Sequence, residues 1–268
     1  MSTAWIIFIV VLSALLLILI ALFLLFVFQE RLIFKPEAVP EDYQFEFNLP
    51  FEELFFEPRK GVRLNAVLFK AKESKGLCLF FHGHSGSNAT WGYVAEEIVK
   101  NGWDCLVYDY RGYGKSTGKH RAEISLHKDA EFVYEVMSER YNGEEIIFVG
   151  QSLGSGIATR LATKFIPKKL LLITPYFNFA DVVHFHYPFL PARMMLKYRF
   201  ATNKLISELV CPVYLIHGTK DTLVPFESSI RLSSLSDNIL LTTIQGGEHG
   251  NLQTYEEYRD LMKDVLSV

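Results

Sequence analysis

Hydrophobic and polar positions divide the chain into one long apolar segment and a body of shorter, alternating patterns. The apolar segment covers residues 4–28, where Ser13 is the one polar interruption and no side chain is charged. As an α-helix, these 25 residues would extend about 37 Å, more than the roughly 30 Å thickness of a bilayer's hydrocarbon core. We therefore expect a single transmembrane anchor helix at 4–28.

A cleaved signal peptide is the main alternative for this segment. No Lys or Arg precedes the run, its apolar part is long, and no small-x-small cleavage pattern stands before the polar flank. A buried core helix does not fit the length of the run. Arg31 and Lys35 follow the segment, so the positive-inside bias favours a single-pass membrane protein with a cytoplasmic body. Two positive side chains leave a periplasmic or extracellular body open.

The remaining chain is expected to form a linker at 29–52 and one domain at 53–268. Three prolines and mixed polar and aromatic residues mark the linker. In the domain, apolar runs typical of buried strands occur at 62–70, 77–81, 105–108, 146–149, 170–173, 213–216 and 240–244. Apolar residues at helical spacing lie between several of them, at 91–99, 126–137 and 153–165, and again at 255–266. This alternation predicts the α/β class: a mostly parallel sheet with helices on both faces and reactive groups at the carboxyl ends of its strands.

Charge and cysteine content narrow the function classes. The net charge is −3 and no Lys/Arg stripe is visible, so we expect no nucleic-acid partner. The three cysteines, Cys78, Cys105 and Cys211, are far apart and show neither a disulfide framework nor zinc spacing.

The strand expected at 146–149 runs into Gly150-Gln151-Ser152-Leu153-Gly154. This sequence fits the G-x-S-x-G nucleophile elbow, in which a serine stands on a sharp strand-to-helix turn and the flanking glycines avoid steric collisions. A glycine-rich helix start is the alternative, but a strand before the motif and a helix after it favour the elbow. Ser152 is therefore our candidate nucleophile.

A serine nucleophile needs a base and an orienting carboxylate. His249 is the one histidine that follows the last expected strand, and Asp221 follows the strand at 213–216. The order Ser152, Asp221, His249 is the chain order of this hydrolase architecture. Asp181 and Glu248 are competing acids that we rank below Asp221.

Acyl transfer also needs donors for the developing oxyanion. We expect the backbone N–H of Leu153, directly after the nucleophile, and that of His84, in the loop after 77–81. His82, in the same loop, is expected to have a structural role.

Two other patterns do not carry chemistry. Gly112-Tyr113-Gly114-Lys115-Ser116 resembles part of a phosphate loop, but Asp109 and Thr117 occupy the positions where the nucleotide-binding patterns need glycine. His184 and His186 lack a third ligand at metal-binding spacing. We expect no metal and no cofactor.

Several stretches of the chain resemble the α/β-hydrolases, in particular the membrane-anchored abhydrolase-domain and serine-aminopeptidase-like branch. They are Phe81-His82-Gly83, Tyr108 to Ser116, Gly150 to Gly154, His217 to Asp221 with Val224-Pro225, and Gly247 to Asn251. The resemblance implies the α/β-hydrolase fold, with the family's nucleophile, acid and base on Ser152, Asp221 and His249. It implies a structural role for Arg111 and Gly112, with Asp109 anchoring their loop. His84 departs from the asparagine that relatives often carry, which leaves a backbone donor unaffected. The branch contains esterases, lipases, thioesterases and peptidases, so it fixes the reaction class but not the substrate.

The insertion at about 175–210 is rich in aromatic residues and Met, with basic residues interleaved. One interpretation is a short cap on the core, and the other is a lid that forms an apolar acyl pocket near the bilayer. Our hypothesis is a membrane-anchored serine hydrolase that cleaves an ester, thioester or amide of a lipid-like or acylated substrate through an acyl-enzyme. The alternatives are a serine aminopeptidase-like enzyme, which would need an acid such as Glu227 or Asp181 in its pocket, and an inactive membrane-anchored binding protein. Oligomeric state is not predicted.

Overall fold

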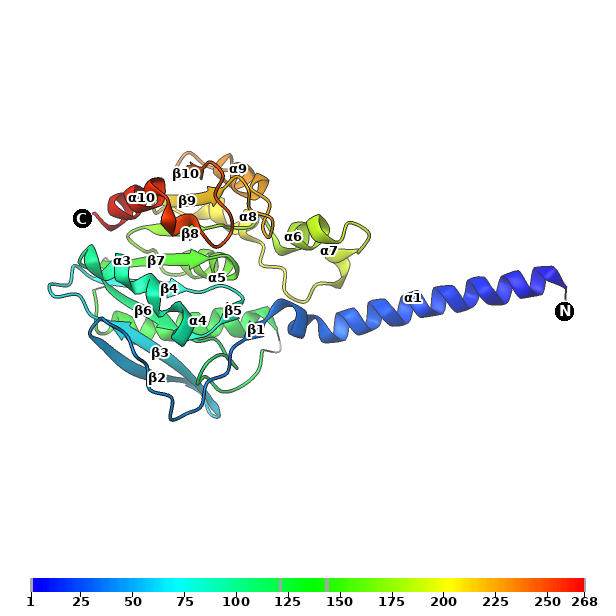
Figure 1. The fold of residues 1–268 in the computed structure, drawn as a ribbon, viewed down its shortest axis with the longest axis horizontal. Helices are drawn as coiled ribbons and strands as arrows, with labels where there is room; N and C mark the ends of the chain where they lie inside the picture. The colour runs from blue at the N-terminus through cyan, green and yellow to red at the C-terminus, as the bar shows by residue number, and fades with distance from the viewer. Residues whose placement is uncertain (1, 121, 143–144, 268) are drawn as a thin grey trace.

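The computed structural model describes residues 2–120, 122–142 and 145–267, and one eight-stranded sheet runs through the body of this part of the chain (Figure 1). Its strand order is β10-β9-β8-β7-β4-β6-β3-β2. The strands are β2 (Phe51–Arg59), β3 (Val62–Phe69), β4 (Leu77–Phe81), β6 (Asp104–Tyr108), β7 (Ile146–Gln151), β8 (Leu170–Ile173), β9 (Val213–Gly218) and β10 (Ile239–Ile244). The pairs β2·β3 and β3·β6 are antiparallel and the other pairs are parallel, which confirms the expected mostly parallel sheet.

Both faces of the sheet are buried, which explains why the strands are apolar along their length. In β4, Leu77, Leu79 and Phe81 pack into one core cluster, whereas Cys78 and Phe80 pack into the other. The helices on the first face are α4 (Glu123–Ser138), α5 (Leu153–Ala162) and α9 (Glu227–Ser233), and those on the second are α3 (Ala95–Lys100) and α10 (Glu256–Leu266). The fold is therefore a three-layer arrangement, and the ends of the parallel strands meet at one edge.

Helix α1 (Thr3–Ile33) projects from this body (Figure 1). It is long and apolar enough to cross a membrane, and Gln29 and Ile33 are its buried residues. The helix ends at Ile33, five residues beyond the end of the expected segment at 4–28.

The region after α1 is attached to the body. Strand β1 (Lys35–Pro36) pairs in parallel with β5 (Ser85–Gly86), and Ala38 forms an isolated bridge with Gly114. Part of the expected linker at 29–52 is thus held by main-chain hydrogen bonds to distant loops. A two-residue pairing leaves no periodic pattern in the sequence, so only the folded chain shows it.

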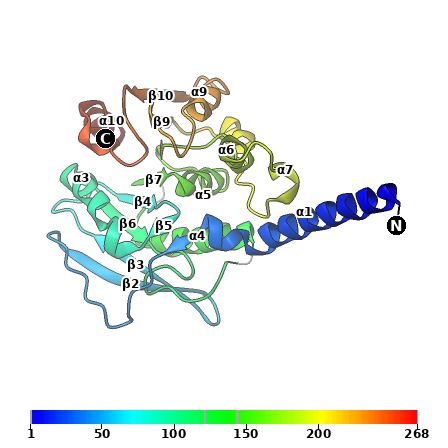
Figure 2. The same ribbon diagram turned by 45° about the vertical axis from the view of Figure 1, so that its right-hand side comes forward.

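The cap lies between β8 and β9. It contains α6 (Phe179–His186), α7 (Ala192–Met195), α8 (Thr202–Leu205) and the 3-10 turn η3 (Ile206–Glu208). Helices α6 and α7 lie on the side of the body from which α1 leaves (Figures 1 and 2). Further short helical segments among the described residues are α2 (Asn88–Trp91), η1 (Gly92–Val94) and η4 (Leu252–Thr254).

Candidate active site

Ser152 occupies a strained turn between β7 and α5. Its φ is 51° and its ψ is −116°, in the region of backbone space that costs a non-glycine residue about 1–3 kcal/mol. A Cβ on Gly154 would lie 2.0 Å from the carbonyl oxygen of Phe81, and one on Gly150 would lie 2.6 Å from that of Gly154. The two glycines of the G-x-S-x-G pattern are therefore required by close backbone packing, and the serine between them is held in one orientation.

Asp221 and His249 are in direct contact. The Nδ1 of His249 lies 2.7 Å from Oδ2 of Asp221. Because a carboxylate only accepts hydrogen bonds, Nδ1 carries the proton and Nε2 of His249 is free to accept one. Asp181 instead pairs with Arg231 at 2.8 Å, so it does not compete for this histidine.

The carboxylate of Asp221 has a full set of donors. Its Oδ1 accepts hydrogen bonds from the N–H groups of Leu223 and Val224, both at 2.8 Å, and its Oδ2 also lies 3.1 Å from Nε2 of His217. Burial alone would raise the pKa of Asp221, but the hydrogen bonds from His217 and His249 outweigh it and bring that pKa well below its ordinary value. Asp221 is thus an anion at any physiological pH.

His217 is the residue that the sequence analysis did not single out. It is completely buried, and its Nδ1 lies 2.7 Å from Oγ of Ser229. Since Nε2 donates to Asp221, Nδ1 accepts from the serine hydroxyl. The position of His217 at the end of β9 was a signal, because side chains at carboxyl ends of parallel strands gather at the site.

The loop after β4 places His84 near Ser152. A Cβ on Gly83 would lie 3.8 Å from the Cβ of Ser152, and His84, Ser152 and Leu153 line the same cavity. The N–H of Leu153 opens α5, where no earlier helical carbonyl can accept it. In the described part of the chain, neither this N–H nor that of His84 has a hydrogen-bond partner.

Several contacts hold this loop in place. The carbonyl oxygen of His84 accepts hydrogen bonds from the N–H of Lys35 at 2.8 Å and from the hydroxyl of Tyr113 at 2.6 Å. Burial lowers the pKa of His82 to about 4, so its neutral ring is placed to donate from Nδ1 to the carbonyl of Gly83 at 2.8 Å. Burial also lowers the pKa of His84, and interactions with Lys35 and His249 lower it further.

The arginine-glycine loop has a structural arrangement. Arg111 makes a two-pronged ion pair with Asp129, at 2.7 and 2.6 Å, and Oδ1 of Asp109 accepts the N–H of Asn88 at 2.8 Å. A Cβ on Gly114 would lie 1.9 Å from Oδ2 of Asp109. These contacts fix the loop that packs beneath His82 and His84.

The structure brings the expected site residues to one edge of the sheet in two groups. Ser152, Leu153 and His84 share a cavity, and Asp221 and His249 form a bonded pair. In the described residues, no hydrogen bond joins the hydroxyl of Ser152 to His249. Catalytic hydrogen bonds are often long in an enzyme without substrate and shorten in the complex. His184 and His186 lie on α6 of the cap, and no metal-binding cluster occurs in the residues described.

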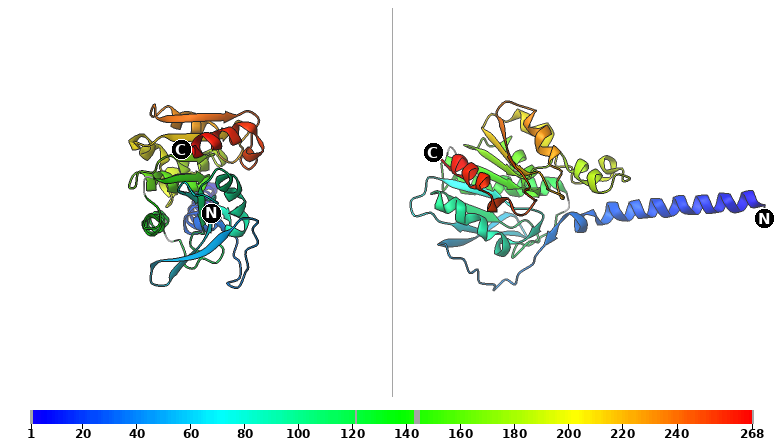
Figure 3. Two further views of the ribbon diagram at one scale, coloured as in Figure 1. Left: turned by 90° about the vertical axis from the view of Figure 1, so that its left-hand side faces the viewer. Right: turned by 45° about the horizontal axis from the view of Figure 1, so that its top comes forward.

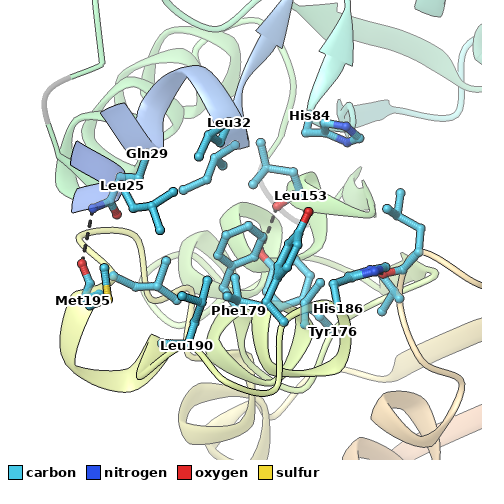
Figure 4. A pocket seen from close by; sticks show the side chains of 18 of the residues that line it. Leu25, Gln29, Leu32, His84, Leu153, Tyr176, Phe179, His186, Leu190 and Met195 are labelled. Carbon is cyan, nitrogen blue, oxygen red and sulfur yellow. Dashed lines mark hydrogen bonds between the residues drawn. The ribbon is translucent and has the colours of Figure 1, made fainter. Parts of the chain in front are cut away.

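The cavity beside Ser152 has a volume of about 680 Å³, within the usual range of about 300–1,000 Å³ for small-molecule sites. The cap, the elbow and the end of α1 all contribute to its walls. Leu25 and Leu32 of α1 lie across from Phe179 and Leu190 of the cap (Figure 4). Most lining side chains are apolar, and none of the described lining residues is Asp or Glu. The site therefore suits an apolar substrate group.

Comparisons with known proteins agree with this arrangement. Residues 72–205 match the family described as serine aminopeptidase, S33. An uncharacterized protein of Mycobacterium tuberculosis is 31% identical over 208 residues, covering 76% of this chain and 74% of that protein. Alpha/beta hydrolase domain-containing protein 17C of Homo sapiens is 26% identical over 237 residues, which cover 84% of this chain and 69% of that protein. The lysophosphatidylserine lipase ABHD12 of Danio rerio is 28% identical over 62% of this chain. The matched region spans about half of that lipase, 48% of its length.

An esterase of Pyrococcus furiosus has the same fold, with a TM-score of 0.68 at 18% identity over 87% of this chain and 97% of the esterase. The sequence matches identify the family, and the structural likeness agrees with the fold described above. The chain is a hydrolase of the α/β-hydrolase fold and belongs to the serine aminopeptidase S33 family, in its abhydrolase-domain branch.

Proposed function

We propose that this hydrolase is a membrane-anchored serine esterase or thioesterase that acts on a lipid-like or acylated substrate. The observation that carries the proposal is the bonded pair of Asp221 and His249 at the edge of the sheet where Ser152 stands on its strained turn beside an apolar cavity. The similarity to a lysophosphatidylserine lipase in sequence, and to an esterase in fold, is consistent with such a substrate.

In this mechanism Ser152 Oγ attacks the carbonyl carbon of the substrate and its proton passes to Nε2 of His249. Asp221 holds the imidazole in the tautomer that can accept this proton and stabilises the positive charge that results. His249 then protonates the leaving group, and the acyl group remains on Ser152. Water, deprotonated by His249, then attacks the acyl carbon. The bond from that carbon to Oγ breaks, His249 returns the proton to Oγ of Ser152, and the acid is released.

The negative oxygen that forms in each step lies toward the N–H groups of Leu153 and His84. Both N–H groups lack other partners among the described residues, so they are available to donate to it. A single donor of this kind contributes about 2.7–4 kcal/mol of barrier reduction in serine hydrolases. The dipole of α5 adds partial positive charge at the same point.

Anchoring belongs to the same proposal. Helix α1 has the length and composition of a membrane span, and Arg31 and Lys35 at its end favour a cytoplasmic body. Protease accessibility of the body in sealed right-side-out and inverted vesicles distinguishes the two orientations.

The cavity gives less support to a peptide substrate. A peptide's N-terminal ammonium needs an acidic partner, and the described lining residues include none. Asp181 is engaged by Arg231, with Arg193 at 3.6 Å. We therefore favour acyl esters and thioesters over aminoacyl amides.

Hydrolysis by the detergent-solubilised protein tests the proposal. Acyl esters should be cleaved, aminoacyl amides should not, and Ser152→Ala should abolish cleavage with folding retained. Ser138→Ala, on the exposed end of α4, is the matched control and should match the wild type. Ester cleavage that survives in Ser152→Ala would refute the assignment of the nucleophile.

A further inference from the structure

The end of α1 is part of the wall of the candidate active-site cavity. Leu25, Gln29 and Leu32 line it from one side, and Leu190 and Met195 of the cap line it from the other (Figure 4). The cavity thus continues from Ser152 to the place where the apolar helix leaves the body. An anchor that served only as a tether would not need to form part of this wall.

A buried amide joins the two walls. Gln29 is 6% exposed on a helix whose apolar neighbours are mostly exposed. Its Nε2 donates to the carbonyl oxygen of Met195 at 3.2 Å and its Oε1 accepts the N–H of Lys197 at 2.8 Å. The same Nε2 also donates to the carbonyl of Phe26 at 2.9 Å. These bonds fix the distance between α1 and the cap, so specific contacts maintain the space between them.

The length of the apolar run places this part of α1 at the membrane surface. Residues 4–28 extend about 37 Å, and a hydrocarbon core of about 30 Å takes roughly 20 residues. The last few apolar positions, Leu25 among them, therefore lie near the boundary between lipid and water.

The cap carries exposed apolar side chains on the same side of the molecule. Phe189 is 80% exposed and Met194 is 86% exposed, with Phe185 and Tyr187 more than half exposed. Helices α6 and α7 project from the body on the side of α1 in Figures 1 and 2 and in the right-hand view of Figure 3. Large exposed apolar side chains next to a membrane span are typical of residues that enter the bilayer surface.

From these observations we infer that the acyl chain of a bilayer lipid ester enters the active site directly from the membrane, between α1 and α6–α7, and binds against Leu25 and Leu32. The inference rests on the proposed function and identifies the substrate-binding residues and the source of the substrate. The carbonyl reaches Ser152 while the distal methylenes remain against α1. The anchor helix is then one half of the acyl-chain site.

Two matched substitutions on α1 test this assignment in the full-length protein in phosphatidylcholine vesicles. Leu25→Trp fills the cavity wall, whereas Leu24→Trp places the same ring one position away, on a residue that is 47% exposed and does not line the cavity. The readout is the ratio of kcat/KM for monododecanoylglycerol in the vesicles to that for p-nitrophenyl butanoate in solution. We expect Leu25→Trp to lower this ratio roughly tenfold or more, as a misfit in an apolar pocket does, and Leu24→Trp to leave it unchanged. Equal ratios for the two variants overturn the inference.

A photo-crosslinking experiment shows where the acyl chain of the substrate binds. Ser152→Ala is reconstituted with a monoacylglycerol that carries a diazirine near the end of its acyl chain. Crosslinks to the cavity-lining positions within residues 25–33 or 179–196 support the inference, and crosslinks confined to other parts of the body contradict it. A wild-type protein that neither cleaves esters nor reacts with a fluorophosphonate would instead refute the proposed function, and the inference with it.

Discussion

Asp221 accepts hydrogen bonds from two imidazoles and two backbone N–H groups, and this explains how a carboxylate stays ionised at the edge of a buried sheet. Burial opposes its charge, and the four donors more than compensate. The donors also fix the carboxylate geometrically, so His249 is held by a partner that cannot rotate away. His217 is thus a positioning residue for Asp221.

Substitution can show which of two acids near His249, Asp221 or Glu248, acts with it. We expect Asp221→Asn to lower kcat by about 10³–10⁴-fold, because the amide favours the wrong imidazole tautomer. Glu248→Gln should leave kcat near the wild-type value, since the backbone N–H of Glu248 bonds to Asn251 and its carboxylate does not contact His249. Steady-state kinetics on both variants decide the question, and a larger loss in Glu248→Gln would reverse the assignment.

His120 makes the stability of the fold depend on pH. Burial, with smaller contributions from the charge of Arg111 and from the neighbouring His82, lowers its pKa from 6.5 to about 4. Between these pH values the unfolded chain binds a proton that the folded chain does not, so the free energy of unfolding falls as the pH falls, by about 3 kcal/mol at most. His120→Phe keeps the ring packed against Phe34 and removes the titration. Urea unfolding of the solubilised protein between pH 7 and 4.5 should show a flatter pH dependence for the variant, and identical slopes would contradict this account.

At the scale of elements, the elbow depends on how closely α5 approaches β4. We expect Gly154→Ala to destabilise the protein by about 1–3 kcal/mol or more, because the new Cβ would lie 2.0 Å from the carbonyl oxygen of Phe81. Gly250→Ala is the control, since nothing lies within 4 Å of its Cβ position. Urea midpoints measure both variants. A Gly154→Ala protein as stable and as active as the control would show that the close approach is not needed.

The pairing of β1 with β5 connects the end of α1 to the loop that carries His84. Lys35→Pro removes the N–H that donates to the carbonyl oxygen of His84, whereas Lys35→Ala keeps that N–H and removes the charged side chain. Because a misplaced oxyanion donor costs turnover, we expect the proline variant to lower kcat by about 10- to 100-fold and the alanine variant to have little effect. Equal values of kcat for the two variants would show that the pairing of β1 with β5 does not affect turnover.

For the molecule as a whole, the sequence predicted the central strands of the sheet better than the short and peripheral elements around them. Seven strands lie where the apolar runs placed them, within one or two residues at most ends, because a strand buried on both faces is apolar throughout. Strand β2 was not predicted, since most of its side chains are exposed and its pattern is weak. Helix α9 and strand β1 were not predicted either, because they are short and depend on distant partners.

In the candidate site, too, features that follow from local patterns and strand order were predicted, and other contacts between distant parts of the chain were not. The motif around Ser152 is local, and its strained turn follows from the two glycines. The contact between Asp221 and His249 follows from the ends of adjacent parallel strands. The position of His217 at the end of β9 hinted at the second imidazole on Asp221, but only the folded geometry shows their bond. The share of α1 in the cavity depends on tertiary packing that no local pattern records.

If Ser152 is the nucleophile of a working serine hydrolase, a reagent that reacts with activated serines will label it covalently. The full-length protein is treated with a fluorophosphonate in membranes, and the adduct is located by peptide mass spectrometry. We expect one adduct, on Ser152, which is absent from Ser152→Ala and forms much more slowly in Asp221→Asn. A wild-type protein that stays unlabelled, or an adduct on another residue that persists in Ser152→Ala, would contradict this assignment.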